Sequence, residues 1–326
     1  MNSGDTAWIL ASSALVLLMT PGLALFYGGL ARSKNAAATI MHSFMTIGIV
    51  GVVWVLWGYT LAFGPDIGKF VGDFAWFGLK DVSATEAGPY ADNIPHQTFM
   101  IFQAMFAIIT PALITGAFAE RMKFSAYVVF IVLWVTIVYA PMAHWVWGGG
   151  WLGELGALDF AGGTVVHINS GVAALAAAII FGRRLGFGRE PMEPHNIPLI
   201  VLGAGLLWFG WFGFNAGSAL EAGGSATNAF VVTNTAAAAG ILGWVAMSWI
   251  FGKKPSVIGA ASGAVAGLVA ITPASGFVGA MPAIIIGLGA GIMCYLAIQL
   301  LVKLNVDDSL SVWGVHGIGG TWGALA

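Results

Sequence analysis

Ten apolar stretches, separated by short polar segments, dominate this chain. They lie near residues 7–30, 37–63, 97–119, 124–147, 162–182, 197–219, 226–251, 256–273, 277–302 and 309–326. A helix needs roughly 20 apolar residues to cross a hydrocarbon core about 30 Å thick. Only 8% of the residues are charged, whereas about 25% is usual for a soluble domain. The sequence therefore predicts an all-α, multi-pass membrane protein.

Basic residues follow every second predicted span. Ten of the twelve lysines and arginines do so: Arg32, Lys34, Arg121, Lys123, Arg183, Arg184, Arg189, Lys253, Lys254 and Lys303. The other two, Lys69 and Lys80, lie in the one long connection, residues 64–96, which is expected to be an ordered external loop. Because lysines and arginines of short loops stay in the cytoplasm, we expect the N-terminus outside.

Two histidines occupy matching positions in the two halves of the chain. His167 lies eight residues after Asp159, and His316 lies eight residues after Asp308, each inside an apolar stretch. Ionisable groups at membrane depth usually face a cavity and mark an ion or proton route. Eight residues of helix rise about 12 Å, so inverted halves would bring both histidines close to the midplane. A matched pair of this kind predicts a binding point at the interface of two repeats.

The spans group into two inverted five-helix repeats, approximately 7–182 and 197–326, within a single domain of residues 1–326. Thr110-Pro111 and Thr272-Pro273 lie in spans that hold equivalent places in the two repeats. The repeats are inverted because five, the number of spans in each, is odd.

The sequence lacks the residues that several functional classes require. There is one cysteine, Cys294, no metal-ligand cluster, and no set of nucleophile, base and acid, so neither an enzyme nor a metal or other cofactor is expected. No basic cluster is present to bind nucleic acid, and no lysine lies inside a span to hold retinal. The histidines His42 and His144 are expected to be structural, each bonded to a backbone carbonyl.

Five segments carry a resemblance to a known family. They are Pro21-Gly22-Leu23-Ala24-Leu25-Phe26-Tyr27-Gly28-Gly29-Leu30, Ala119-Glu120-Arg121, residues 159–169, residues 211–218 and Val315-His316-Gly317. With them the chain resembles the ammonium transporter (Amt/Mep/Rh) family, in particular its bacterial Amt branch. The resemblance implies an eleven-helix fold, a homotrimer with one pore per subunit, and a place in the bacterial plasma membrane. It also implies that an eleventh helix and a cytoplasmic tail, which in relatives helps dock a PII-type regulator, are absent here.

The resemblance assigns roles to individual residues. Trp147 and Ser218 match an outer recruitment site for ammonium, with Phe102 in its wall. Phe106 and Phe214 match a stacked phenyl gate. His167 and His316 match a pair of pore histidines. The supporting positions are Asp159, Trp211 and Thr272. Trp313 departs from the phenylalanine expected in many relatives, and we expect it to narrow the lower pore.

Each outer-site residue also has a purely structural interpretation. Trp147 lies at the end of a span, where tryptophans commonly anchor the membrane interface. Asp159 is placed to cap the following helix. Without the family resemblance, Phe106 and Phe214 would be interpreted as packing residues. The matching surroundings of His167 and His316 set that pair apart.

Selection between ammonium and potassium needs chemistry beyond size. An aromatic face attracts a cation by roughly 0.5–2 kcal/mol, and a hydroxyl accepts an N–H that a metal ion lacks. An apolar pore penalises any bare cation, but ammonium can release its proton and continue as ammonia. A neutral imidazole accepts on one nitrogen and donates from the other, so two linked imidazoles could relay that proton and make transport electrogenic.

The leading functional prediction is an ammonium/ammonia transporter. The alternative is an ammonium-sensing domain of a membrane receptor, whose cytoplasmic signalling module would follow residue 326. A Rh-like channel for the neutral gas is disfavoured, because an outer site built from Trp147 and Ser218 suits a cation.

Overall fold

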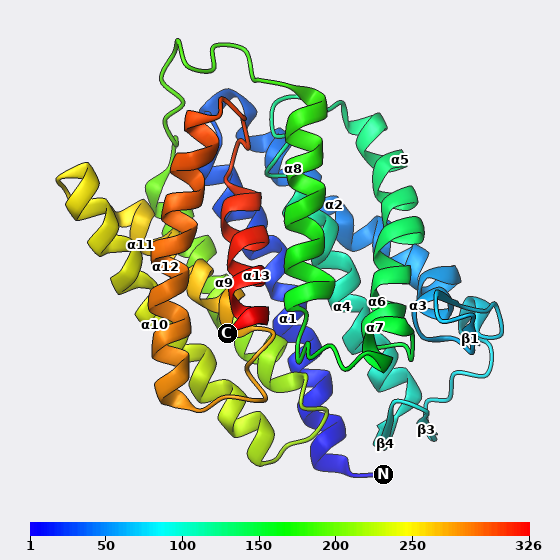
Figure 1. Cartoon of the computed structure of the whole chain (residues 1–326). Helices are drawn as coiled ribbons and strands as arrows, with labels where there is room; N and C mark the ends of the chain where they lie inside the picture. Colours follow the sequence, from blue (N-terminus) through cyan, green and yellow to red (C-terminus); the bar gives the residue numbers. More distant parts are fainter.

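The computed structural model describes residues 1–326, and helices account for nearly all of its regular structure (Figure 1). The first five crossings are formed by α1 (Ser3–Leu30); α2 (Ala36–Val53) with the π-helical turn η2 (Trp54–Gly58) and α3 (Tyr59–Phe63); α4 (His96–Ile114); α5 (Phe124–Trp134) with the π-helical turn η4 (Val135–Tyr139) and α6 (Ala140–Val146); and the π-helical turn η5 (Gly163–Ile168) with α8 (Asn169–Phe181). The short helices η1 (Ser33–Asn35) and α7 (Trp151–Glu154) lie between crossings.

The second five crossings follow a 15-residue connection at residues 182–196. They are α9 (Ile197–Gly217), α10 (Gly224–Gly252), α11 (Val257–Ile271), α12 (Ala280–Lys303), and the π-helical turn η6 (Trp313–Gly317) with α13 (Ile318–Leu325). Eight helical segments are long and apolar enough to cross a membrane, and α11 is a shorter apolar helix of 15 residues. All ten predicted spans fall on helices, which confirms the multi-pass all-α prediction.

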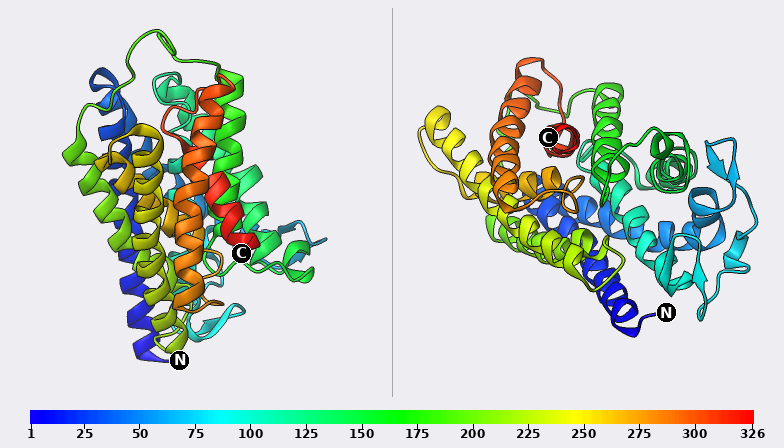
Figure 2. Two further views of the ribbon diagram at one scale, coloured as in Figure 1. Left: turned by 60° about the vertical axis from the view of Figure 1, so that its left-hand side comes forward. Right: turned by 60° about the horizontal axis from the view of Figure 1, so that its bottom comes forward.

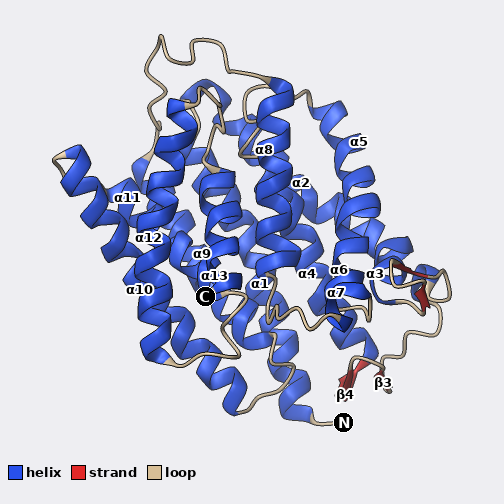
Figure 3. Cartoon of the chain, viewed as in Figure 1, coloured by secondary structure: helices blue, strands red, loops and turns tan.

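The long connection between α3 and α4 contains strands that the sequence did not predict. β1 (Asp66–Ile67) pairs antiparallel with β2 (Val71–Gly72), and β3 (Ala87–Gly88) pairs with β4 (Ala91–Pro95). The short helix η3 (Phe77–Leu79) lies between these two hairpins. Figure 3 shows the strands at one edge of the bundle. Strands of two to five residues are too short to produce a readable alternation, so the loop was correctly expected to be ordered but its hairpins were missed.

The closest pairing of long helices joins the two halves of the chain. α1 and α9 run side by side along most of their length (Figure 2). Gly213 shows why they approach so closely: a Cβ atom there would lie 2.8 Å from the Ser12 carbonyl oxygen on α1. Small residues at a helix interface allow such contacts in a membrane, where helices gain little from apolar burial alone. This pairing forms one wall of the bundle centre.

A cluster of charged residues ties together the loops at one end of the bundle. Arg184, after α8, forms an ion pair of 2.8 Å with Asp307, after α12, and its backbone N–H donates to the same carboxylate at 2.7 Å. Arg121, after α4, donates to the Asp307 carbonyl oxygen at 2.8 Å, and Arg32, after α1, pairs with Glu120. The loops after the first, third, fifth and ninth crossings therefore lie at the same end, as the alternation of spans requires.

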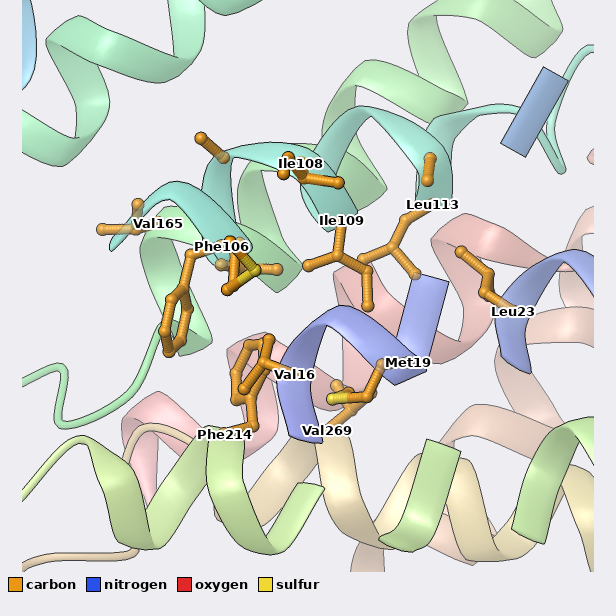
Figure 4. Close-up of a cluster of buried hydrophobic side chains, with 14 of the residues drawn as sticks. Val16, Met19, Leu23, Phe106, Ile108, Ile109, Leu113, Val165, Phe214 and Val269 are labelled. Atoms are coloured by element: carbon orange, nitrogen blue, oxygen red, sulfur yellow. The ribbon is translucent and has the colours of Figure 1, made fainter. Parts of the chain in front are cut away.

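The hydrophobic core surrounds the centre of the bundle. Figure 4 shows part of it, where Val16 and Met19 of α1 face Phe106 and Ile109 of α4 and Phe214 of α9. All five side chains are buried. The core therefore lies among the same helices that carry the predicted functional residues.

Candidate functional site

The structure places the two matched histidines side by side in the buried centre. His167 lies on η5 and His316 on η6, with ring centroids 5.2 Å apart and planes 28° apart. Their exposed fractions are only 1% and 3%. The two Nδ1 atoms are 3.2 Å apart, which is hydrogen-bonding distance. The pair is therefore in direct contact, away from bulk solvent.

Backbone packing explains how two segments 149 residues apart in sequence bring their rings together. α8 contacts η6, and α13 contacts η5. A Cβ atom at Gly171 of α8 would collide with the backbone of Gly317, next to His316. A Cβ atom at Gly320 of α13 would lie 3.0 Å from the Cβ atom of His167. Both histidines also lie on π-helical turns, which are frequent at functional sites.

The Nδ1–Nδ1 contact constrains the protons on the pair. Because one nitrogen must donate and the other accept, two neutral rings carry opposite tautomers, one protonated at Nδ1 and the other at Nε2. The Nε2 atom of His167 is buried and has no hydrogen-bond partner in the protein. A buried polar atom without a partner is unusual. This atom is free to interact with a small polar molecule beside the ring.

Aromatic side chains support the His167 ring. It stacks on Trp211, with centroids 5.4 Å apart, and on Phe214, with centroids 5.8 Å apart. The Trp211 Nε1–H donates to the Thr272 hydroxyl oxygen at 2.9 Å, and that hydroxyl donates to the Leu268 carbonyl at 2.8 Å. The Trp211 indole therefore supports the His167 ring, and Thr272 fixes the position of that indole.

The space beside the histidines is a narrow apolar gap of about 10 Å³. A buried water needs at least 10–15 Å³ on a comparable measure, so the gap holds no more than about one small molecule. Ten of its twelve lining residues are hydrophobic, and among them are Met19, Leu23, Ile109 and Val265. His167 and His316 supply polar atoms to this wall. The gap is too small and too apolar to hold a hydrated ion.

A larger cavity of about 370 Å³ lies on one side of the gap. Its lining includes the three predicted outer-site residues, Phe102, Trp147 and Ser218, together with the gate residue Phe106 and the supporting residue Asp159. The Phe106 ring lies 4.4 Å from the Phe214 ring between centroids (Figure 4), and 5.9 Å from the Trp147 indole. Since Phe214 also lines the gap, the two phenyl rings stand between the cavity and the histidines.

Hydrogen bonds fix how Trp147 and Ser218 meet this cavity. The Trp147 indole N–H donates to the Asp159 carbonyl oxygen at 2.8 Å. The Ser218 hydroxyl donates to the Phe214 carbonyl oxygen at 2.8 Å, so its proton is used and its lone pairs remain to accept an N–H. The aromatic face and the hydroxyl acceptor line the same cavity.

The Asp159 carboxylate is occupied by the backbone. It accepts the N–H groups of Gly162, Gly163, Thr164 and Val165 at 2.6 to 3.0 Å, which caps the N-terminal end of η5. Asp159 is therefore a helix cap, as its structural interpretation predicted, and it fixes the start of the segment that carries His167.

A second cavity, of about 320 Å³, lies beyond the gap and is lined by His316, Tyr27, Tyr295 and several serines. Trp313 lines neither this cavity nor the gap. Its indole lies against Gly317, on the backbone of the same helical turn. That Trp313 narrows the lower pore therefore stays a prediction.

The sequence analysis missed the apolar residues that shape the gap, because one leucine or methionine in a span resembles any other. Gly171 and Gly320 could have indicated the close helix contacts, because small residues mark such contacts in a membrane. The chain has 47 glycines, however, and nothing in the sequence distinguishes these two. No group of three or more histidines, cysteines, aspartates or glutamates could hold a metal ion.

The fold and these cavities define a multi-pass membrane protein with a narrow internal passage between two wider cavities. The family model for the ammonium transporter family matches residues 7–326. The chain therefore belongs to the ammonium transporter family.

Individual relatives agree with this assignment. An ammonium transporter of Bacillus subtilis is 57% identical over 327 residues, covering 100% of this chain and 80% of that protein. The crystal structure of Saccharomyces cerevisiae Mep2 matches with a TM-score of 0.94 at 40% identity, covering 100% of this chain and 75% of that one. A structure described as a sensor Amt protein matches with a TM-score of 0.92 at 34% identity, covering 99% of this chain and 81% of that one.

Proposed function

We propose that this chain moves ammonium across the membrane by recruiting the cation in the outer cavity and conducting it as ammonia past His167 and His316. The observation that carries the proposal is the position of the two histidines, in an apolar gap of about 10 Å³ between two larger cavities. A gap of this size and polarity suits a small neutral amine and penalises a bare cation.

Recruitment takes place at Trp147 and Ser218. The indole face attracts the cation through its quadrupole, worth roughly 0.5–2 kcal/mol, and the Ser218 oxygen accepts one N–H. Phe102 and Phe106 complete the aromatic wall of this cavity. Potassium can use the aromatic face but has no N–H to donate, so this step favours ammonium modestly.

The main selection takes place at Phe106 and Phe214. Passage through the gap requires ammonium to leave its proton behind, because the apolar lining cannot replace the hydration shell of an ion. Potassium has no proton to release and is retained in the outer cavity. Beyond the phenyl pair, ammonia meets the unpartnered Nε2 atom of His167 and passes along the two rings to the inner cavity.

The released proton follows the imidazole pair. The Nε2 atom of His167 accepts the proton from ammonium, and His167 passes its Nδ1 proton to Nδ1 of His316, 3.2 Å away. His316 then gives up its Nε2 proton on the side of the inner cavity. Ammonia regains a proton in the inner cavity, so one positive charge moves for each ammonium and transport is electrogenic.

Orientation and assembly complete the proposal. The loops that carry the clustered arginines face the cytoplasm, because short loops rich in lysine and arginine stay inside. The Trp147 cavity and the N-terminus then face outward, in the plasma membrane of a bacterium. The functional unit is a homotrimer with one passage per subunit, which the family resemblance implies.

The experiment that tests this function is an ammonium-evoked current in proteoliposomes that contain the purified protein. A current is expected that saturates with ammonium and persists when excess potassium is added to both sides. An equal current with potassium alone would overturn the proposal, because the gap would then pass a bare cation.

A second function is favoured by one of the structural relatives. The match to a structure described as a sensor Amt protein fits the alternative in which ammonium occupancy of this domain is a signal. A domain of that kind would bind ammonium in the outer cavity without a steady current. Ammonium binding measured by calorimetry, together with the absence of a current, would favour the sensor over the transporter.

A further inference from the structure

His144 lies on α6, three residues before Trp147, and both of its ring nitrogens face oxygen acceptors. Nδ1 is 2.9 Å from the Ala62 carbonyl oxygen, and Nε2 is 2.8 Å from the Asp66 Oδ1 atom. The ring is fully buried, with an exposed fraction of 0%. The expectation of a histidine bonded to a backbone carbonyl is therefore met, but the second partner is a carboxylate from the long external loop.

Two oxygen acceptors hold this imidazole in place. The contact with Asp66 joins α6 to the external loop, and the contact with the Ala62 carbonyl oxygen joins α6 to α3. The hydrogen bond from His144 holds the pKa of Asp66 below its ordinary value of 3.8, which keeps the carboxylate charged.

Other charged groups near the pair lie on the same external loop and on α7. The Lys69 ammonium is 3.8 Å from Asp66 Oδ2 and 2.7 Å from Glu154, and the Lys69 backbone N–H donates to Asp66 Oδ1 at 2.9 Å. The Asp66 side chain is 29% exposed. The contact therefore joins a solvent-accessible carboxylate to a buried imidazole ring.

The backbone of His144 holds the turn that carries Trp147. The His144 carbonyl oxygen accepts the N–H groups of Gly148, at 3.0 Å, and of Gly150, at 2.9 Å. The Tyr90 hydroxyl, from the same external loop as Asp66, lies 2.8 Å from the Phe63 carbonyl oxygen and 3.3 Å from the Gly148 carbonyl oxygen. A movement of His144 would therefore move the residues that follow Trp147.

We propose that the contact between the buried His144 ring and the Asp66 carboxylate is a positioning device, which fixes the Trp147 turn against the external loop and so sets the affinity of the outer cavity for ammonium. This inference rests on the proposed function, in which Trp147 recruits the cation. His144 and Asp66 act through Trp147 and do not touch the substrate.

The test compares KM and kcat of the ammonium current for four variants in proteoliposomes. Asp66→Asn removes the carboxylate charge and so weakens the contact with His144. We expect KM to rise about tenfold, within the range for a weakened cation–π site, with kcat changed less than about twofold. Asp66→Glu keeps the charge and should restore most of the affinity. Asp92→Asn is the matched control, since Asp92 is an exposed aspartate of the same loop, and it should leave KM unchanged. Trp147→Leu tests the recruitment site itself.

The outcomes separate this inference from the proposed function. If Trp147→Leu raises KM but Asp66→Asn does not, the positioning role is overturned and the transporter function stands. If Trp147→Leu leaves KM unchanged, recruitment at Trp147 is wrong, and the positioning role falls with it.

Discussion

Replacement of Ser218 by alanine tests the role of one atom in the outer cavity, the Ser218 hydroxyl oxygen. The Ser218 hydroxyl donates to the Phe214 carbonyl, so the only capacity it has left is to accept. The variant removes that acceptor without adding bulk. The Phe214 carbonyl loses one donor.

The size of the effect follows from the charge of the ligand. A hydrogen bond to a charged group contributes about 1.5–3 kcal/mol. Ser218 is half-buried beside a cavity of about 370 Å³, so water partly replaces the lost oxygen and the lower end of the range applies. A loss of about 1.5 kcal/mol is about tenfold in affinity. We therefore expect KM for ammonium to rise about tenfold and the affinity for potassium to change little.

The measurement is the KM of the ammonium current in proteoliposomes, with potassium as competitor. Ser225→Ala is a suitable control, because Ser225 lies at the start of α10 and does not line the cavity. An unchanged KM in Ser218→Ala would refute the assignment of Ser218 as an N–H acceptor, even if transport continued.

The remaining predictions concern stability and selectivity. Asp307→Asn leaves the buried Arg184 guanidinium without its carboxylate and should lower the free energy of unfolding by about 3–5 kcal/mol. The measurement is the apparent melting temperature in detergent, which should fall markedly. A fall no larger than that of a surface variant would contradict this prediction. Phe214→Ala removes a fully buried ring at a cost of about 3–5 kcal/mol and should admit a potassium current that the unaltered protein lacks, whereas a potassium-tight variant would show that the phenyl pair is not the barrier. The hydrogen bond from His144 lowers the pKa of Asp66 below 3.8, so their contact stabilises the fold above that pH and is lost as the pH falls through the lowered pKa. The melting temperature of the unaltered protein should therefore fall more steeply below pH 3.8 than that of Asp66→Asn. Parallel curves for the two proteins would argue against the contact.

Much of the fold could be predicted because a membrane leaves few choices. Apolar length locates the helices, and the alternation of basic loops sets their direction. The prediction was least accurate where geometry is set by local turns: the third span ends at Ile114, before the predicted residue 119, and α11 is shorter than the predicted span. The small hairpins of the external loop left no pattern in the sequence.

The site was only partly readable from the sequence. The duplicated aspartate and histidine spacing pointed to His167 and His316, because the same chemistry recurs in matching apolar surroundings. Three features needed the structure: the Nδ1–Nδ1 contact, the second acceptor of His144, and the absence of Trp313 from the inner cavity. Each depends on which way a side chain points from a known helix, and spacing along the chain does not determine this.

The central claim is that ammonium crosses the apolar gap as ammonia while the two imidazoles carry the proton. The most direct test is the ammonium current of the protein in which His167 and His316 are both replaced by leucine, measured beside ammonia uptake in the same proteoliposomes. The account predicts that the current is lost or strongly reduced, while any remaining uptake carries no charge. An undiminished current that still excludes potassium would contradict it.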